Sequence, residues 1–329
     1  MIRNFTTALF LTLAAYSFSG CGSSDPKKEV DTSTTGTIKM SVDDTFLPLA
    51  DAELQTFHSL YKFAQINVSY RPEAEIVRDL QRDSARTIMI SRLLTKKETE
   101  VFDKLKIQIK PLKIAVDAVA IVMHPDNPTE QFTVTQLAGI LSGKVSNWSQ
   151  VEGNTTDAGI TIVFDNQNSS TVRYLADSVL LNKPFAGNAF AANTNPEVVE
   201  YVSKNKNAIG VIGLSWISDH DDTLSSNFLQ KIKVAALKED RNGRTGEYCQ
   251  PYQAYLTPNS TKLYPLRRNI YLISREARAG LATGFASFVA SERGQRIVLK
   301  SGLLPATMPI RLVQFGDSDK IERRHGDQK

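Results

Sequence analysis

Short apolar runs alternate along the chain with segments of helical periodicity. A short continuous apolar run is typical of a buried strand, and apolar residues spaced three and four apart are typical of a helix. The predicted strands are 37–42, 66–70, 87–91, 112–124, 160–164 and 264–274, and the predicted helices are 49–63, 73–83, 95–106, 133–141 and 281–302. Strands and helices that alternate in this way predict an α/β fold whose sheet is mostly parallel.

Two of the apolar runs predict strands that cross from one lobe to another. Residues 112–124 are apolar almost throughout, and residues 264–274 form the second candidate crossing. Two long strands on either side of an inserted α/β region predict two lobes, each built from discontinuous chain, with a cleft between them. We expect residues 37–115 and 264–314 to form lobe I and residues 116–263 to form lobe II.

The N-terminus has the pattern of a secretory segment. Arg3 precedes an apolar core at 8–18 that is too short to span a bilayer. The next residues, 18-FSGC-21, resemble the lipobox of bacterial lipoproteins, although a phenylalanine stands where leucine is usual. We therefore predict that 1–20 is a lipoprotein signal peptide and that Cys21 carries lipid. An ordinary cleaved signal peptide is the alternative.

The remaining composition limits the class of protein further. Residues 21–36 read as a polar flexible tether, and 315–329 as a frayed tail of mixed charge. The formal net charge of +4 is spread without a basic block, so nucleic acid is not indicated as a partner. If Cys21 is lipidated, Cys249 is the one other cysteine and is expected to be a packed thiol.

The stretch 164-FDNQNSSTVRYLADSVL-180 places small polar residues between a strand and a helix. The strand ends before 168-NSST-171, and helical periodicity begins at Val172. The first N–H groups of a helix have no partner inside the helix. The polar residues are therefore either simple N-caps or an anion site formed by bare N–H groups, hydroxyls and the helix dipole.

A longer pattern begins at residue 115. It contains an apolar strand, Asn127-Pro128, a short helix, 142-SGK-144 and Asn147-Trp148, in that order. This order resembles the phosphate-binding proteins of bacterial phosphate ABC transporters.

Further matches to that family follow at 207–213, 264–274 and 294–305, so the resemblance covers most of residues 37–310. It implies the α/β two-lobed fold of type II periplasmic binding proteins. In that fold two doubly wound sheets are joined by two crossing strands, with a ligand cleft between them.

The resemblance implies an anion clamp made by two helix starts. The family's Ser-Gly-Thr in the second lobe corresponds to Ser169, Ser170 and Thr171, and its Thr-Phe in the first lobe corresponds to Thr45-Phe46. In the family these residues bind phosphate. Together with the neighbouring motifs, they favour the anion site over simple caps.

The chain departs from the family where charge matters. Asp165 stands where the family usually has an arginine, and Ser91 stands where it has an aspartate or a small polar residue. We expect Arg92 and Arg173 to supply the positive charge, although each could be an ordinary surface arginine. We also expect the carboxylate of Asp165 or Asp44 to accept the proton of hydrogen phosphate. The same carboxylate would repel sulfate, which is fully ionised.

The implied function is capture of inorganic phosphate by an extracytoplasmic, lipid-anchored protein that delivers it to an ABC permease. Such a protein belongs to the bacterial cell envelope, on the periplasmic or outer surface, and needs no cofactor. The alternatives are another oxyanion such as sulfate or molybdate, or a sensor or adhesion lipoprotein that has lost the ligand. A phosphate-ester hydrolase is disfavoured because no activated nucleophile or metal pair is evident. The 218-SDHDD-222 segment could hold a metal but is typical of a solvated turn.

Lipidation of Cys21 is directly testable. Metabolic labelling with a fatty acid should mark the wild-type protein and leave Cys21→Ala unlabelled, because the thiol is the predicted attachment point. A Cys21→Ala protein that keeps the label would contradict the assignment.

Overall fold

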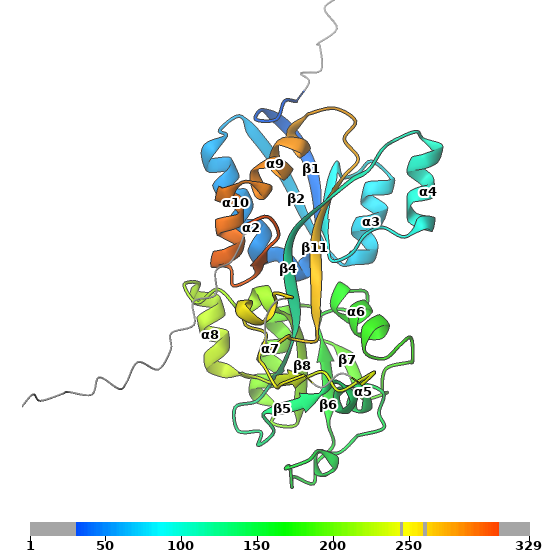
Figure 1. Cartoon of the computed structure of the whole chain (residues 1–329), viewed down its shortest axis with the longest axis vertical. Helices are drawn as coiled ribbons and strands as arrows, with labels where there is room; N and C mark the ends of the chain where they lie inside the picture. Colours follow the sequence, from blue (N-terminus) through cyan, green and yellow to red (C-terminus); the bar gives the residue numbers. More distant parts are fainter. Residues whose placement is uncertain (1–30, 244–245, 259–261, 309–329) are drawn as a thin grey trace, which may run out of the picture.

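The computed structural model of the chain describes residues 31–243, 246–258 and 262–308. The predicted signal peptide, the predicted lipidation site Cys21, most of the tether and the tail from 315 lie outside these residues. Two lobes are stacked along the long axis of the molecule (Figure 1). The exact lobe boundaries remain predictions, and the names lobe I and lobe II are kept for the upper and lower lobes of Figure 1.

The strands and helices follow the predicted alternation, and the structure adds helices at Asn195–Lys204 and Thr223–Lys231 that were not predicted. The strands are β1 (Gly36–Asp43), β2 (Ala64–Arg71), β3 (Thr87–Ile90), β4 (Lys110–Met123), β5 (Gln131–Thr133), β6 (Thr161–Phe164), β7 (Ala189–Ala191), β8 (Ala208–Gly213), β9 (Lys233–Val234), β10 (Ala236–Lys238), β11 (Arg267–Ser274) and β12 (Leu304–Pro305). The α-helices are α2 (Leu47–Leu60), α3 (Glu73–Gln81), α4 (Lys96–Lys104), α5 (Val134–Leu141), α6 (Ser170–Ser178), α7 (Asn195–Lys204), α8 (Thr223–Lys231), α9 (Leu281–Ala290) and α10 (Glu292–Lys300). Short 3₁₀ turns are η1 (Asp44–Phe46), η2 (Trp148–Gln150), η3 (Leu214–Trp216) and η4 (Gln253–Tyr255).

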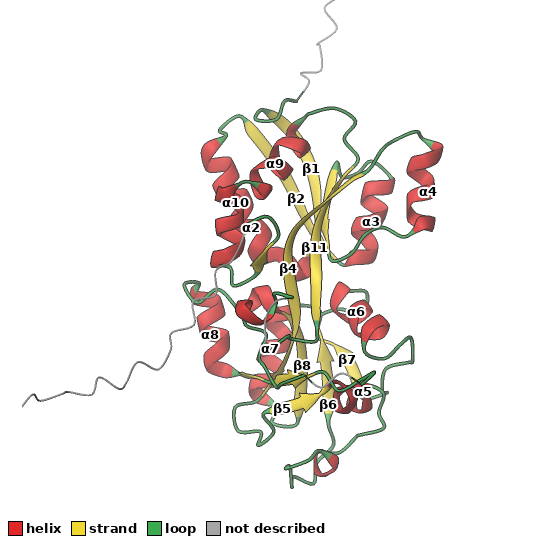
Figure 2. Cartoon of the chain, viewed as in Figure 1, coloured by secondary structure: helices red, strands yellow, loops and turns green. Residues whose placement is uncertain are grey.

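The predicted two-lobed α/β fold is confirmed, but the sheet is mixed and not mostly parallel, because the strands that join the lobes pair antiparallel with their neighbours. Its strands follow the order β2-β1-β3-β11-β4-β8-β6-β7, and hydrogen bonding is continuous from one lobe to the other through β4. Pairing is parallel where β1 meets β2 and β3, and where β6 meets β7 and β8. It is antiparallel where β11 meets β3 and β4 and where β4 meets β8. The crossing strands run in opposite directions because the chain enters lobe II along β4 and returns along β11 (Figure 2).

The two crossing strands lie where the sequence predicted them. β4 is buried without interruption from Ile114 to Met123, which explains an apolar run longer than an ordinary strand. Helices α2, α3, α4, α9 and α10 lie around the strands of lobe I, and α5 to α8 around those of lobe II (Figure 1). Within the described residues, none of the helices is both long and apolar enough to cross a membrane.

The prediction of a single helix over 281–302 is wrong, because the structure has two helices there. The helical chain is interrupted at Ser291, whose extended backbone ends α9 and begins α10. The Ser291 side chain accepts a hydrogen bond from the Gly294 N–H, so it acts as an N-cap within the predicted span. Apolar periodicity continues across the break, and the sequence pattern therefore did not reveal it.

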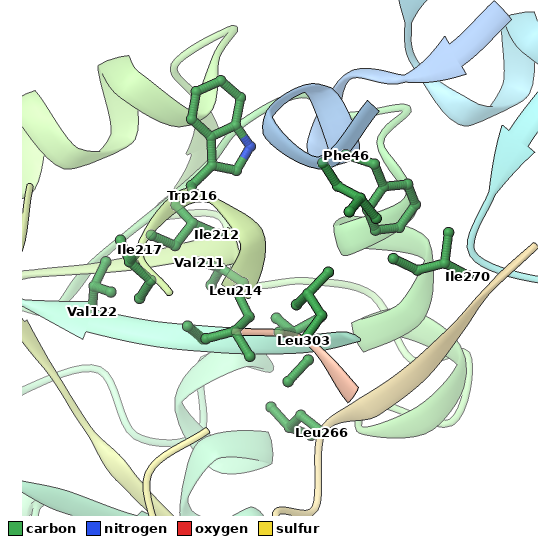
Figure 3. Packing of buried hydrophobic residues seen from close by; sticks show 14 of the residues in the cluster. Phe46, Val122, Val211, Ile212, Leu214, Trp216, Ile217, Leu266, Ile270 and Leu303 are labelled. Carbon is green, nitrogen blue, oxygen red and sulfur yellow. The ribbon is translucent and has the colours of Figure 1, made fainter. Parts of the chain in front are cut away.

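The apolar core continues across the junction of the lobes. One cluster of buried side chains contains Phe46 from lobe I, Leu214 and Trp216 from lobe II, and Ile270 from the crossing strand β11 (Figure 3). Because these side chains pack into one cluster, the two lobes are in direct contact in this arrangement.

Gly213 provides a test of this contact. A β-carbon at Gly213, the last residue of β8, would lie 2.4 Å from Thr45 Cγ2 of lobe I, far inside an ordinary carbon–carbon contact. We therefore expect Gly213→Ala to hold the lobes apart, with a larger radius of gyration in small-angle scattering than the wild type. Gly159→Ala is the control, because its added carbon would meet nothing closer than 3.9 Å. Equal radii for Gly213→Ala and the wild type would contradict the closed contact.

Candidate functional site

A buried ion pair joins the two crossing strands at the junction of the lobes. Arg268 of β11 and Asp117 of β4 are directly opposite in the antiparallel register. The Arg268 side chain is 1% exposed, and its Nε donates to Asp117 Oδ2 at 2.8 Å. A buried charge is tolerated only when it is paired and hydrogen-bonded, so each residue makes the other acceptable in a strand interior.

The rest of the Arg268 guanidinium faces the start of α6. Its Nη1 donates to Ser170 Oγ at 3.0 Å and lies 3.5 Å from Thr171 Oγ1. The Phe46 ring lies beneath it, with the centroid 4.9 Å from Cζ. Nη2 is buried and has no hydrogen-bond partner among the described residues. Although burial alone lowers the pKa of Arg268, Asp117 and Asp43 raise it above its usual value, so the group stays charged.

The start of α6 has an N-cap of the kind that the sequence predicted, and polar residues follow the cap. Ser169 is the N-cap, because its Oγ accepts from the Val172 N–H at 3.2 Å, and the same hydroxyl donates to Asp165 Oδ1 at 2.7 Å. Ser170 and Thr171 are fully buried and follow the cap. Their N–H groups are the first two of the helix and have no carbonyl one turn earlier to bond to. Donors and the positive end of the helix dipole therefore converge beside Arg268.

Lobe I contributes Thr45 to the same place. Thr45 Oγ1 lies 3.5 Å from both Ser170 Oγ and Asp165 Oδ2, and the Thr45 carbonyl accepts from Ser215 Oγ at 2.9 Å. Its N–H donates to Asp43 Oδ1 at 3.0 Å, so that amide is bound by the chain's own carboxylate. We call Thr45, Asp117, Asp165, Ser169, Ser170, Thr171 and Arg268 the Arg268 cluster.

The Arg268 cluster is surrounded by carboxyl groups that are hard to ionise. Burial raises the pKa of Asp165 to about 6, against hydrogen bonds from Ser169 and the Asn166 N–H that lower it. Burial also raises the pKa of Asp44 to about 8, and the negative charges of Asp43 and Asp165 raise it further. The pKa of Asp43 is raised by burial and then by the charge of Glu73. Such groups hold a proton easily, so they can share one with a bound ligand.

Three of the predicted residues meet in a different cluster, around Glu73. Arg173 Nε donates to Glu73 Oε1 at 2.7 Å, and Arg92 Nε donates to the same oxygen at 2.6 Å. Ser91 Oγ donates to Glu73 Oε2 at 3.0 Å. Arg92 also donates to both oxygens of Glu98, at 2.7 and 2.8 Å. We call Glu73, Ser91, Arg92, Glu98 and Arg173 the Glu73 cluster.

The predicted site residues therefore separate into two groups. Thr45, Ser169, Ser170, Thr171 and Asp165 lie together in the Arg268 cluster, with Phe46 beneath the guanidinium and Asp44 next to Thr45 on η1. Ser91, Arg92 and Arg173 lie in the Glu73 cluster, where the charges of both arginines are bound by carboxylates. None of the described hydrogen bonds joins either guanidinium to Thr45 or to a hydroxyl of 169–171.

Sequence reasoning missed Arg268, Asp117 and Glu73. The signal for the first two was a charged residue inside each predicted crossing strand, since buried charges of opposite sign on neighbouring strands have to pair. Among the described residues, no group of three or more His, Cys, Asp or Glu side chains could hold a metal ion, and so the 218–222 alternative gains no support. Cys249 is buried, and burial raises the pKa of its thiol to about 11.

Two curated relatives resemble the chain over most of its length. The phosphate-binding protein PstS of Pseudomonas aeruginosa is 25% identical over 294 residues, which cover 85% of this chain and 86% of the relative. The phosphate-binding protein PstS of Borreliella burgdorferi is 25% identical over 270 residues, which cover 79% of this chain and 86% of the relative.

Solved structures show the same architecture. A candidate phosphate ABC transporter substrate-binding protein with bound phosphate, from Clostridium perfringens, superposes with a TM-score of 0.67 at 21% identity and covers 82% of this chain and 99% of its own. An ABC-type phosphate transport receptor from Vibrio cholerae superposes with a TM-score of 0.62 at 20% identity and covers 82% of this chain and 100% of its own. The family model of the PBP superfamily domain matches residues 28–293. The chain therefore belongs to the PBP superfamily.

Proposed function

We propose that this protein captures inorganic phosphate between its lobes and delivers it to the permease of an ABC transporter. The observation that carries the proposal is the buried Arg268 guanidinium, whose Nη2 is unpartnered among the described residues and which faces the hydroxyls of Ser170 and Thr171. An arginine fork beside a helix N-terminus is suited to a tetrahedral oxyanion. The relatives and solved structures named above, which are phosphate-binding or phosphate-transport proteins, support the same ligand.

The proposed ligand contacts come from both lobes. Arg268 supplies the charge, Ser170 and Thr171 supply hydroxyl and N–H donors, and Thr45 closes the site from lobe I. Asp165, one of the two acids that the sequence suggested together with Asp44, accepts the proton of hydrogen phosphate. Ser91, Arg92 and Arg173 shape the mouth of the cleft through the Glu73 cluster. Within this proposal, Arg268 takes the role of main cationic donor that we first expected of Arg92.

The proposed setting is the cell envelope, with the protein held at the membrane by lipid on Cys21. We propose a binding role and not a catalytic one, since the chemistry of the Arg268 cluster is that of donors and proton acceptors. If the protein were instead a phosphate-ester hydrolase, the purified protein would turn over a generic aryl phosphate. This turnover can be assayed alongside binding. Sulfate and molybdate remain the rival ligands.

Arg268→Lys tests the proposed site. Lysine keeps the charge opposite Asp117 but loses the planar fork, so phosphate affinity should fall about 10- to 150-fold, as for loss of a charged hydrogen bond. The measurement is calorimetric titration of ligand-stripped protein with phosphate, sulfate and molybdate. Arg267→Lys is the matched control, because Arg267 precedes it on β11 and donates to the Leu256 carbonyl at 3.0 Å, away from the cluster. An affinity like that of the wild type in Arg268→Lys would remove this residue from the site.

Asp165→Asn tests how the anion is selected. The ionised carboxylate accepts the proton of hydrogen phosphate and repels sulfate, so the variant should bind phosphate more weakly and sulfate equally well or better. Because the pKa of Asp165 is about 6, sulfate binding by the wild type should strengthen as the pH falls through 6, and this dependence should shrink in the variant. Asp103→Asn, at an exposed position of α4 away from both clusters, should change the binding of neither ligand. Parallel losses for phosphate and sulfate in Asp165→Asn would contradict the selection role.

A further inference from the structure

Glu73 is a buried carboxylate at the start of a helix in lobe I. It is the first residue of α3, directly after Pro72, and its side chain is only 3% exposed. A negative charge in the first helical turn is stabilised by the helix dipole. Its described hydrogen-bond partners are side chains, because no side-chain cap bond is made at the start of α3.

The Glu73 carboxylate is bound by donors from both lobes. From lobe I it accepts Arg92 Nε at 2.6 Å and Ser91 Oγ at 3.0 Å. From lobe II it accepts Arg173 Nε at 2.7 Å and Arg173 Nη2 at 3.2 Å, one on each oxygen. The same Nη2 donates to Ser91 Oγ at 2.8 Å. The Arg173 contact is thus a two-point ion pair across the junction of the lobes.

Arg173 stands on the helix that carries the proposed ligand donors. It lies in the first turn of α6, just after Ser170 and Thr171, and its backbone N–H bonds to the Ser169 carbonyl at 3.1 Å. A bond that fixes Arg173 to lobe I therefore also fixes the start of α6 against lobe I. Burial first, and the charge of Glu73 next, raise the pKa of Asp43, whose carboxylate accepts the Thr45 N–H.

We propose that Glu73 is a positioning residue that acts as an internal anion. Its carboxylate binds Arg173 across the cleft and so holds the two lobes together before a ligand arrives. A contact that is present in the closed arrangement and absent from the open one shifts the population toward the closed arrangement. The inference deepens the proposed function by naming a control on closure, but the interlobe contact can be measured with no ligand at all.

The ion pairs made by the two arginines of the cluster support this role. Arg92 is shared between Glu73 and Glu98, which leaves Arg173 as the one cation of the Glu73 cluster that reaches it from lobe II. Arg173 also pairs with Asp177 at 3.0 Å on its own helix. Loss of Glu73 would therefore leave each arginine with a carboxylate in its own lobe and remove the ion pair between lobes.

The test compares Glu73→Gln with Glu75→Gln. Both remove one carboxylate from the first turn of α3, but Glu75 is half-exposed and its described ion pair is with Arg71 at 4.0 Å, in the same lobe. Spin labels on Lys97→Cys in lobe I and Glu152→Cys in lobe II report the interlobe distance by double electron–electron resonance. The native Cys249 is buried, and Cys21 is replaced by serine in the labelled protein.

Without phosphate, Glu73→Gln should shift the distance distribution toward longer values than the wild type, and Glu75→Gln should not. Arg173→Gln should cause the same shift, and the double variant should show no further shift, because one interaction is removed in each case. A wild-type distribution in Glu73→Gln, or additive shifts in the double variant, would overturn the proposal. If Glu73→Gln does not fold, Arg173→Gln decides alone: a shift to longer distances supports the proposal, and a wild-type distribution overturns it.

Phosphate added afterwards tests the proposed function separately. Phosphate should return Glu73→Gln to the compact distribution, since Glu73 is not one of the proposed ligand donors. If the ligand-free shift is present but phosphate has no effect on any variant, the internal anion stands and the proposed ligand is wrong.

Discussion

The ion pair between Arg268 and Asp117 is the interaction on which the site depends. Both residues lie in strands that pass from one lobe to the other, at positions where the strands are directly opposite. A lone buried charge in such a strand would be expensive, so each residue requires the other. The pair also leaves one edge of the guanidinium turned toward α6. The same contact therefore stabilises the junction of the lobes and presents positive charge at their boundary.

The charge balance around this pair restricts what can bind. One arginine faces Asp43, Asp117 and Asp165, and these carboxylates are buried. Above its pKa of about 6, the ionised Asp165 would repel an anion that carries only negative charge, whereas an anion that carries a proton can donate it to Asp165. Within the proposed site, this favours hydrogen phosphate over sulfate for a reason independent of the relatives.

Much of the fold could be predicted because the signals were local. The apolar run of β4 and the strand-to-helix turn before α6 depend on residues close together in sequence, and both were located correctly. The break at Ser291 was missed because apolar periodicity continues through it. Arg268 was missed for a different reason. Arg267 and Arg268 are adjacent in β11 and point to opposite faces, and only the register with β4 shows which one meets Asp117.

The roles of Arg92 and Arg173 illustrate the same limit. Their positions near predicted ligand residues suggested that they bind the ligand. In the structure, however, both arginines pair with a carboxylate that lies next to them in space. That carboxylate is Glu73, which is 100 residues from Arg173 in sequence. In lobe I, Asp43 accepts the Thr45 N–H at the start of η1, and Glu73 accepts the guanidinium of Arg173. In lobe II, the start of α6 is capped by the neutral Ser169. The two lobes are therefore unequal. Lobe II and β11 carry the donors suited to an anion, together with Asp165 as the proposed proton acceptor, and lobe I supplies Glu73, the carboxylate that we propose controls closure of the cleft.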